Sequence, residues 1–277
     1  MVRKINDYFI LDTEYTTYCF RVMSSGHLEH LYYGRQLFLP DAKSMEALVE
    51  KQVFVSGSVN YYDEEHKIKK EKEMFEDLPG SYSENGEVEG LCITLKDKQY
   101  DLTMEIFYYV YPECDVITRS ARFINSSSEK VNLKRLMSMQ LDLDTPDYVF
   151  TTFTGTWARE MKRTDMRVIS GKHINSAYAG VSSNRANPFV MLSRVGTTED
   201  FGECFGFNLV YSGNHYEAVE VSSCGKTRFV SGINPQSFDF PLEPGEIFEA
   251  PEAVMSYSCQ GFNGKQSKNR GIKYQTK

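Results

Sequence analysis

Leu102-Thr-Met-Glu-Ile-Phe-Tyr-Tyr-Val110 is the stretch of sequence that decides the fold class. Its even-numbered positions are all apolar or aromatic: Leu102, Met104, Ile106, Tyr108 and Val110. Successive side chains of a strand point to opposite faces of a sheet, so this alternation places one face of the segment in a core. The stretch therefore predicts a β-strand that is buried on one side.

The same alternation recurs on both sides of this stretch. Similar segments are expected as strands at 91–95, 117–123, 131–137, 205–211, 216–221, 227–232 and 253–257. Polar or glycine-containing turns separate them, such as Asn125-Ser-Ser-Ser128 and Leu242-Glu-Pro-Gly-Glu246. The chain also contains 18 Tyr and 18 Phe but one Trp, and this aromatic weighting favours pleated sheet over helix.

Many short strands without alternating helices predict an all-β fold, a large antiparallel β-sandwich. No helix of ordinary length with an amphipathic stripe is expected. The helix-like segment 64–77 is dominated by alternating charge, and we interpret it as a solvated surface strand or excursion. One domain is predicted over residues 1–264, because all-β units of this size often form a single core. Residues 265–277 turn basic and lose the apolar pattern, which predicts a disordered or truncated tail.

The charge of the chain argues against nucleic acid as a partner. The formal net charge is -7 with a pI near 5.4, whereas nucleic-acid-binding surfaces concentrate Lys and Arg. No apolar run is long enough for a signal-peptide core or a membrane span, so we expect a cytoplasmic protein without a membrane partner. The six cysteines stand singly and have no histidine at metal-ligand spacing. Buried, reduced thiols and no metal or other cofactor are therefore expected, with a disulfide framework as the alternative.

Two segments carry side chains suited to a sugar-contact site. The first is Thr154-Gly-Thr-Trp-Ala-Arg-Glu160, where Trp157 stands beside Arg159 and Glu160. An indole face can stack on a sugar ring while charged neighbours reach its hydroxyls. The alternative is that Trp157 fills the core and Arg159 pairs with Glu160 at the surface. The second segment, 180–189, contains Ser182, Ser183 and Asn187, which either face a ligand or satisfy their own backbone.

Other titratable residues single out no catalytic centre. Asp142 and Asp144 lie two residues apart on one face of an expected strand, a pattern more typical of a solvated edge. The five histidines have no partner at diagnostic spacing and are interpreted as structural or exposed. Glycoside hydrolysis needs a pair of carboxylates, and the sequence indicates no such pair.

Several strings, taken in order, resemble the amino-terminal domain of glycoside hydrolase family 36, the bacterial raffinose-type α-galactosidases or melibiases. The matching strings lie between about residues 5 and 264 and are Asp115-Val-Ile-Thr-Arg-Ser-Ala-Arg-Phe-Ile-Asn125, Gly155-Thr-Trp-Ala-Arg-Glu160, Ser182-Ser183 with Asn187-Pro-Phe189, Gly206-Phe-Asn-Leu-Val-Tyr-Ser-Gly-Asn214, Gly232-Ile-Asn-Pro235, and Leu242-Glu-Pro-Gly-Glu246 before Pro251-Glu-Ala253.

This resemblance implies a β-supersandwich like that of galactose mutarotase. It also implies an enzyme that hydrolyses terminal α-galactosides with retention, using catalytic aspartates in a (β/α) barrel that this chain lacks. The chain itself is then expected to be inactive and to act as an accessory and oligomerisation domain. Family members form homotetramers in which this domain lends loops to a neighbour's active-site rim. Substrate-rim or interface roles are accordingly expected for Trp157, Arg159, Glu160, Ser182, Ser183 and Asn187.

The chain departs from the family pattern in two places. A Gly-Asp-Phe-Arg-like stretch that reaches the neighbouring subunit is replaced by 56–64, and a Ser-Ser-His-Gln-like loop reads Ser182-Ser-Asn-Arg185. These changes predict an altered linkage preference or the loss of the contact with the neighbour. Two further hypotheses stay open, a stand-alone mutarotase-like enzyme that uses His173 or His215, and a carbohydrate-binding module that uses an exposed Trp157.

Overall fold

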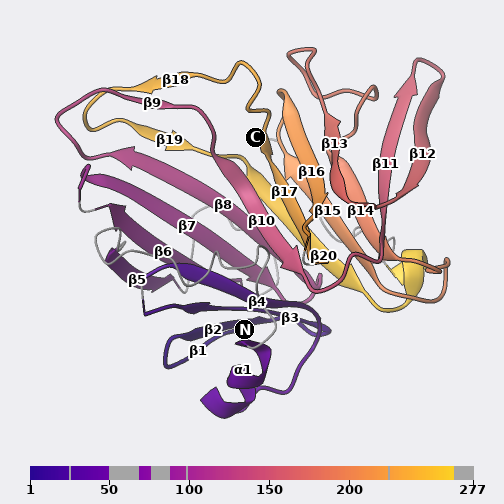
Figure 1. Cartoon of the computed structure of the whole chain (residues 1–277), viewed down its shortest axis with the longest axis horizontal. Helices are drawn as coiled ribbons and strands as arrows, with labels where there is room; N and C mark the ends of the chain where they lie inside the picture. The colour runs from indigo at the N-terminus through magenta and orange to yellow at the C-terminus, as the bar shows by residue number, and fades with distance from the viewer. Residues whose placement is uncertain (25, 50–68, 76–87, 98, 224, 265–277) are drawn as a thin grey trace.

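The computed structural model describes residues 1–24, 26–49, 69–75, 88–97, 99–223 and 225–264, with side chains for all of these except 69–75. Within this part the chain is built from antiparallel sheets that pack around one principal core (Figure 1). None of the described helices is long and apolar enough to cross a membrane. The segment 56–64, residues 64–68 and 76–77 of the 64–77 segment, and the 265–277 tail lie outside the described residues, whereas 69–75 form a strand.

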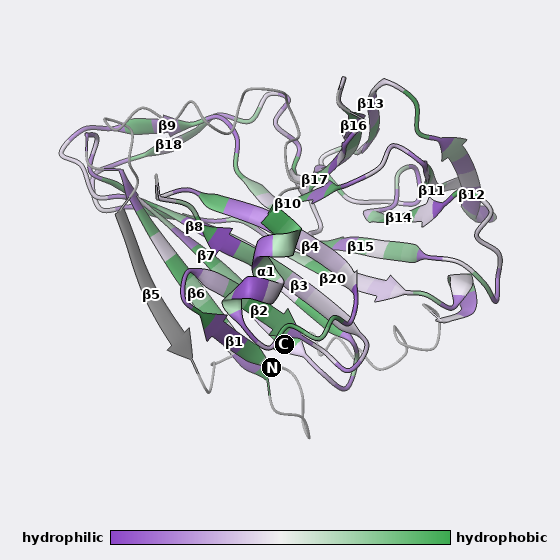
Figure 2. Ribbon diagram, turned by 60° about the horizontal axis from the view of Figure 1, so that its bottom comes forward, coloured by the Kyte–Doolittle hydropathy of each residue, from purple (hydrophilic) through white to green (hydrophobic). Residues whose placement is uncertain are grey.

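The largest sheet has ten strands in the order β12-β11-β14-β15-β20-β8-β7-β6-β5, with β19 also paired to β8. Apolar and polar residues alternate along its middle strands, visible as green and purple segments on β6 to β8 (Figure 2). Its strands are β5 (Lys69–Phe75), β6 (Glu89–Asp97), β7 (Leu102–Tyr111), β8 (Val116–Asn125), β11 (Tyr148–Thr156), β12 (Arg159–Arg167), β14 (Phe189–Arg194), β15 (Cys204–Val210), β19 (Ile247–Glu249) and β20 (Glu252–Ser258).

Three smaller sheets complete the described fold. Sheet β1-β2-β3-β4 comprises β1 (Val2–Ile5), β2 (Tyr8–Asp12), β3 (Thr16–Val22) and β4 (Leu28–Arg35), and it is followed by the short helix α1 (Ala42–Val49). Sheet β10-β17-β16-β13 comprises β10 (Met137–Leu143), β13 (Gly171–Ser176), β16 (His215–Val221) and β17 (Thr227–Ile233). The third is a two-stranded ribbon of β9 (Val131–Leu133) and β18 (Phe240–Leu242).

The principal core lies where the three larger sheets meet. Phe207 on β15 stacks on Phe229 on β17, with ring centroids 4.1 Å apart. On the amino-terminal side, Phe20 on β3 stacks on Tyr108 on β7 at 5.3 Å. All four rings are at most 2% exposed, so the aromatic residues that favoured a sheet in the sequence join the sheets to one another.

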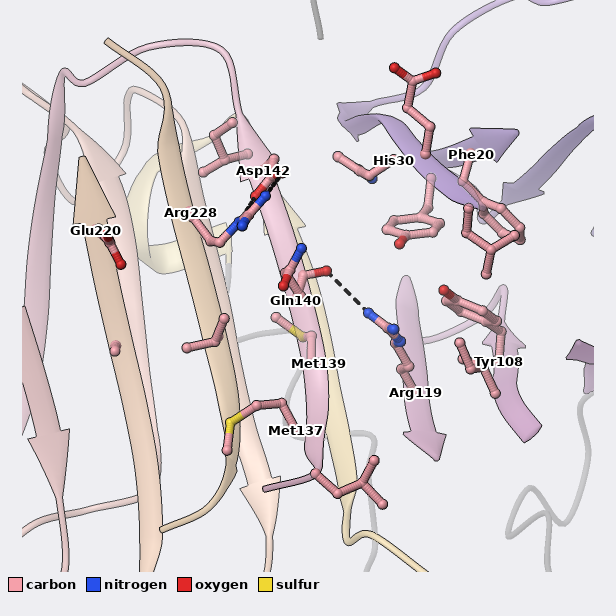
Figure 3. A pocket seen from close by; sticks show the side chains of 18 of the residues that line it. Phe20, His30, Tyr108, Arg119, Met137, Met139, Gln140, Asp142, Glu220 and Arg228 are labelled. Carbon is pink, nitrogen blue, oxygen red and sulfur yellow. Dashed lines mark hydrogen bonds and ion pairs between the residues drawn. The ribbon is translucent and has the colours of Figure 1, made fainter. Parts of the chain in front are cut away.

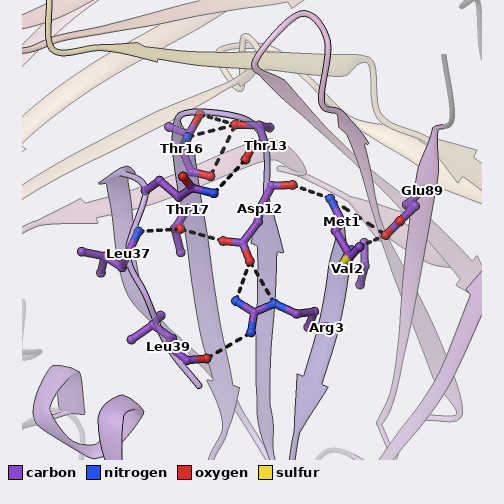
Figure 4. Close-up of polar contacts among 11 residues, drawn as sticks. Met1, Val2, Arg3, Asp12, Thr13, Thr16, Thr17, Leu37, Leu39 and Glu89 are labelled. Atoms are coloured by element: carbon purple, nitrogen blue, oxygen red, sulfur yellow. Dashed lines mark hydrogen bonds and ion pairs between the residues drawn. The ribbon is translucent and has the colours of Figure 1, made fainter. Parts of the chain in front are cut away.

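Polar networks hold the first strands in place. Asp12 accepts hydrogen bonds from the Arg3 guanidinium at 2.6 and 3.0 Å and from Thr17 Oγ1 at 2.7 Å (Figure 4). Arg3 also donates to the Leu39 carbonyl at 3.0 Å, which links β1 and β2 to the chain before α1. The carboxylate of Asp115 accepts from the Thr13 hydroxyl and from the Tyr15 N–H, and thereby links the turn before β3 to the turn before β8.

The predicted all-β sandwich is confirmed, and most expected strands are present. One expectation was wrong in detail, because the segment 131–137 divides between β9 and β10, which belong to different sheets. The expectation of buried thiols was wrong for Cys259, which is exposed, and for Cys114, which is half-buried. The other cysteines of the described part are buried, and none of the described cysteines forms a disulfide. Buried thiols are therefore Cys19, Cys92 and Cys204.

Candidate functional site

The β11–β12 hairpin carries three of the predicted site residues and projects at one end of the large sheet (Figure 1). All nine residues of β12 are exposed. The turn follows a bulge between Thr154 and Thr156, and Ala158 adopts a φ of 59° in the left-handed region that tight hairpin connections require. A Cβ at Gly155 would lie 2.4 Å from the Arg159 carbonyl oxygen, so glycine permits this close approach.

The hairpin tip presents an indole and two charged side chains to solvent. Trp157 is 92% exposed, so the alternative in which it fills the core is wrong. Arg159 and Glu160 follow it on β12, and Glu160 Oε1 accepts a hydrogen bond of 3.2 Å from the Ala158 N–H. Met161, which is 51% exposed, adds a second apolar side chain. A large exposed indole beside charged groups is typical of a contact surface.

The loop of residues 177–188 brings a fourth predicted residue to the hairpin. Asn187 donates its backbone N–H to the Phe153 carbonyl on β11 at 3.0 Å. Its side-chain amide contacts the Met161 sulfur on β12 at 3.3 Å. The structure therefore brings Asn187 together with the hairpin. We call Trp157, Arg159, Glu160, Met161 and Asn187 the hairpin surface.

Ser182 and Ser183 stabilise this loop. The Ser182 N–H donates to the Ser212 carbonyl at 2.7 Å, and the Ser183 carbonyl accepts from the Ala186 N–H at 3.2 Å. Ser183 Oγ also accepts from the Arg185 N–H at 3.3 Å. The Ser183 side chain thus satisfies a local backbone group, as the alternative interpretation of this segment expected, whereas Ser182 contributes a backbone hydrogen bond.

A buried His–Glu pair contacts the backbone of this loop. His215 Nδ1 lies 2.9 Å from Glu217 Oε2, and both side chains are fully buried. His215 Nε2 lies 2.9 Å from the Ala186 carbonyl oxygen. Asn175 on β13 donates to Glu217 Oε2 and to the Asn187 carbonyl oxygen, each at 2.8 Å. The pair therefore fixes the backbone of the loop that carries Asn187.

The protonation of this pair follows from its partners. Burial by itself lowers the pKa of His215, but the hydrogen bond and the charge of Glu217 outweigh burial, and the net effect raises this pKa above its ordinary value. Burial raises the pKa of Glu217, while His215 and Asn175 act in the opposite direction. A proton shared within the pair leaves the pair neutral overall, which suits a fully buried site.

We expect stability to fall as the pH rises above the ordinary histidine pKa of about 6.5. A raised pKa in the folded state means that His215 contributes fully below that pH, and the contribution is lost as the pH rises through the folded-state pKa. Urea unfolding between about pH 6 and about pH 9 measures this slope. The slope should flatten in Glu217→Gln. An equal slope in the variant would contradict the assignment.

The contacts of the other histidines and of Asp142 can be compared with what the sequence predicted for them. His215 is buried with both ring nitrogens occupied, and His173 Nε2 lies 3.3 Å from the Ile169 carbonyl oxygen. Asp142 was expected at a solvated edge, but it is half-buried and receives two hydrogen bonds from Arg228, of 2.6 and 2.7 Å. Among the described residues, no group of three or more His, Cys, Asp or Glu is arranged to hold a metal ion.

The sequence reasoning missed the His215–Glu217 pair, although a signal was available. The two residues stand at i and i+2 of a strand flanked by apolar residues, which places both side chains on one face. A histidine and a carboxylate on a buried face require each other as partners, because a single buried charge is costly.

Comparison with known proteins identifies the family. Residues 56–243 match the model of the glycosyl hydrolase family 36 N-terminal domain. This chain belongs to glycosyl hydrolase family 36. The matched model is that of the family's N-terminal domain, as the sequence resemblance implied.

Curated relatives are α-galactosidases. Alpha-galactosidase AgaA of Geobacillus stearothermophilus is 40% identical over 200 residues, which is 72% of this chain and 27% of that protein. Alpha-galactosidase Mel36A of Lactobacillus acidophilus is 30% identical over 298 aligned residues, which is 93% of this chain and 41% of that protein. The family 36 chain therefore spans less than half the length of these relatives.

Solved structures agree with this assignment. A variant of AgaA in complex with 1-deoxygalactonojirimycin superimposes with a TM-score of 0.85 at 29% identity, covering 96% of this chain and 42% of that one. The α-galactosidase from Lactobacillus brevis gives a TM-score of 0.84 at 29% identity, with 96% and 42% coverage. The described fold is thus that of the amino-terminal β-sandwich of family 36 enzymes.

Proposed function

We propose that this chain is the amino-terminal accessory and oligomerisation domain, residues 1–264, of an α-galactosidase, and that it is inactive alone. One observation carries the proposal: the chain superimposes almost entirely on α-galactosidases but covers only 42% of their length. In this account the catalytic carboxylates lie in the part of the enzyme beyond the match, within a (β/α) barrel. That part performs retaining hydrolysis through a covalent galactosyl-enzyme intermediate.

The substrates that we propose for the whole enzyme are terminal α-galactosides of the melibiose and raffinose type, hydrolysed in the cytoplasm. Structures of AgaA variants in complex with raffinose and with stachyose support this choice. No cofactor is required in this account, because two carboxylates suffice for the chemistry.

The hairpin surface is, in this proposal, the contact with the catalytic part or with a neighbouring subunit of a homotetramer. Trp157 and Met161 are both more than half exposed, and Arg159 stands between them in sequence. Trp and Arg are enriched among the side chains that dominate interface energies. The buried pair of His215 and Glu217 holds Asn187 against the hairpin, which keeps this surface ordered before a partner binds.

Trp157→Ala tests the proposed role of the hairpin surface. We expect weaker self-association of this chain by roughly 2 kcal/mol, about thirtyfold in the dissociation constant, in sedimentation velocity experiments. The free energy of unfolding should change by less than about 0.5 kcal/mol, because the Trp157 side chain is exposed to solvent.

The matched control is Phe38→Ala, since Phe38 is also highly exposed, at 90%, but lies between β4 and α1. Its substitution should leave self-association unchanged. Equal effects of the two substitutions, or a strictly monomeric chain at high concentration, would count against a contact between subunits through this surface.

A further inference from the structure

A cavity of about 690 Å³ lies between the sheets, away from the hairpin surface. Its walls come from β3 and β4 on one side, β7 and β8 on a second, and β10, β16 and β17 on a third (Figure 3). Small-molecule pockets have volumes of about 300–1,000 Å³, are lined by aromatic and apolar side chains, and contain a few placed polar groups. The cavity falls within that range.

Two polar side chains in this cavity have buried donor or acceptor atoms that the described protein does not satisfy. Neither ring nitrogen of His30 forms a hydrogen bond of normal geometry, although the Asp142 backbone lies near enough to raise the pKa of His30, and Arg119 Nε has no partner in the described part of the chain. Buried polar atoms in folded proteins almost always have a partner. His30 comes from β4 and Arg119 from β8, so two independent elements place side chains with unsatisfied atoms in the lining of one cavity.

Within the described part of the chain, contacts other than an ion pair with a carboxylate hold Arg119 in position. Its Nη1 donates to the Gln140 carbonyl oxygen at 3.1 Å, and its Cζ lies 5.5 Å from the centre of the Tyr108 ring. Figure 3 shows Arg119 reaching from β8 towards Gln140 on β10. The guanidinium is therefore positioned by a carbonyl and an aromatic face, and its Nε donor has no partner among the described residues.

Aromatic rings form one wall beside these polar groups. The Tyr18 ring lies 5.1 Å from the His30 ring and 5.6 Å from the Tyr108 ring, and Phe20 stacks on Tyr108. Apolar ring faces next to a few hydrogen-bonding groups suit a ligand with one apolar face and several hydroxyls.

Most charged side chains around the cavity form ion pairs; among the described residues, Arg119 and Arg135 are the exceptions. Arg228 is paired with Asp142 at 2.6 Å, and Lys172 with Glu220 at 3.1 Å. Burial lowers the pKa of His30 to about 4, so its imidazole is neutral at pH 7, with one N–H donor and one acceptor nitrogen. A hydroxyl group both donates and accepts, and can satisfy either nitrogen. A carboxylate oxygen only accepts, so it satisfies the N–H of His30 but not its acceptor nitrogen, and it would also lie close to Asp142.

We propose that this cavity binds a neutral hexopyranose whose hydroxyls hydrogen-bond to His30 and Arg119. The site goes beyond the proposed function, because it is separate from the hairpin surface and lies within this chain. Binding here involves no bond cleavage, so it is independent of whether the chain is part of an active α-galactosidase.

Isothermal titration calorimetry of this chain with D-galactose and with D-glucose tests the proposal. We expect saturable binding of at least one sugar, with a dissociation constant below about 10 mM. Titrations with D-galacturonate and with inorganic phosphate distinguish a neutral from an anionic ligand. Binding of these anions alone, or no binding of either sugar, would overturn the proposal, and ordered water would then account for the unsatisfied atoms.

His30→Phe provides a sharper test, because it keeps a ring of similar size and removes both unsatisfied nitrogens. We expect sugar binding to weaken by about tenfold or more, while the thermal unfolding midpoint stays equal or rises. Arg119→Met gives a second, independent variant with the same expected loss. The control is His173→Phe, whose ring does not line the cavity and which should leave binding unchanged. Unchanged binding in both cavity variants would contradict the site.

Discussion

Glu217→Leu is expected to lower the free energy of unfolding by about 3–5 kcal/mol, because removing one member of a buried ion pair leaves the other without compensation. His215 and Glu217 are both fully buried, with Nδ1 and Oε2 at 2.9 Å. The variant also removes one of the two acceptors of the Asn175 amide. Urea unfolding at neutral pH, with the slope of the transition compared between the proteins, gives the difference directly.

The same strand supplies a matched control. Glu220 lies three residues further along β16 and pairs with Lys172 at 3.1 Å, but both side chains of this ion pair are more than 40% exposed. Pairs of this kind contribute about 0–1 kcal/mol, so Glu220→Leu should have little effect. Similar losses in the two variants would mean that the buried pair does not stabilise the loop and hairpin surface as described.

Phe229→Ala is expected to lower the free energy of unfolding by about 3–5 kcal/mol, because the apolar ring no longer leaves water on folding and a cavity remains in the core. Phe229 on β17 is 0% exposed, and its ring stacks on Phe207 of the large sheet at a centroid distance of 4.1 Å and an interplanar angle of 17°. The substitution therefore weakens the contact between two sheets. Thermal and urea unfolding, followed by far-UV circular dichroism, measure the loss.

An exposed phenylalanine is the control for this test, because its substitution removes the same side chain without leaving a cavity in the core. Phe201 is 74% exposed, so Phe201→Ala should change the free energy of unfolding by less than about 0.5 kcal/mol. If Phe229→Ala were as mild as this control, the two sheets would not share the core that the structure describes.

The strands were predictable from the sequence where one face is buried and the other is partly solvated. Leu102–Tyr111 is such a strand, and its alternating pattern identified it. The segment 131–137 was mistaken for one strand, because alternation reports which face is apolar but not which strand pairs with it. Leu133 pairs with Phe240 in the ribbon, whereas Met137 pairs with Gly232 in another sheet. The change of sheet has no periodic signal.

The position of the candidate site was predicted only in part. The sequence made Trp157 a candidate for substrate-rim or interface contact, with burial in the core as the alternative. Its exposure depends on the bulge at Gly155 and on the left-handed Ala158, which residue types alone do not specify. The cavity around His30 and Arg119 could not be predicted. Its walls come from strands distant in sequence, and only their packing brings the two side chains together.

Hydrolysis of a chromogenic α-galactoside is the most direct test of the central claim that this chain is an accessory domain without catalytic activity of its own. Purified chain is assayed with p-nitrophenyl α-galactoside at high protein concentration, with full-length AgaA as the positive control. The account predicts turnover by AgaA and no release of nitrophenol by this chain above the buffer rate. Saturable hydrolysis by the chain alone would contradict it and would place catalytic carboxylates within these residues.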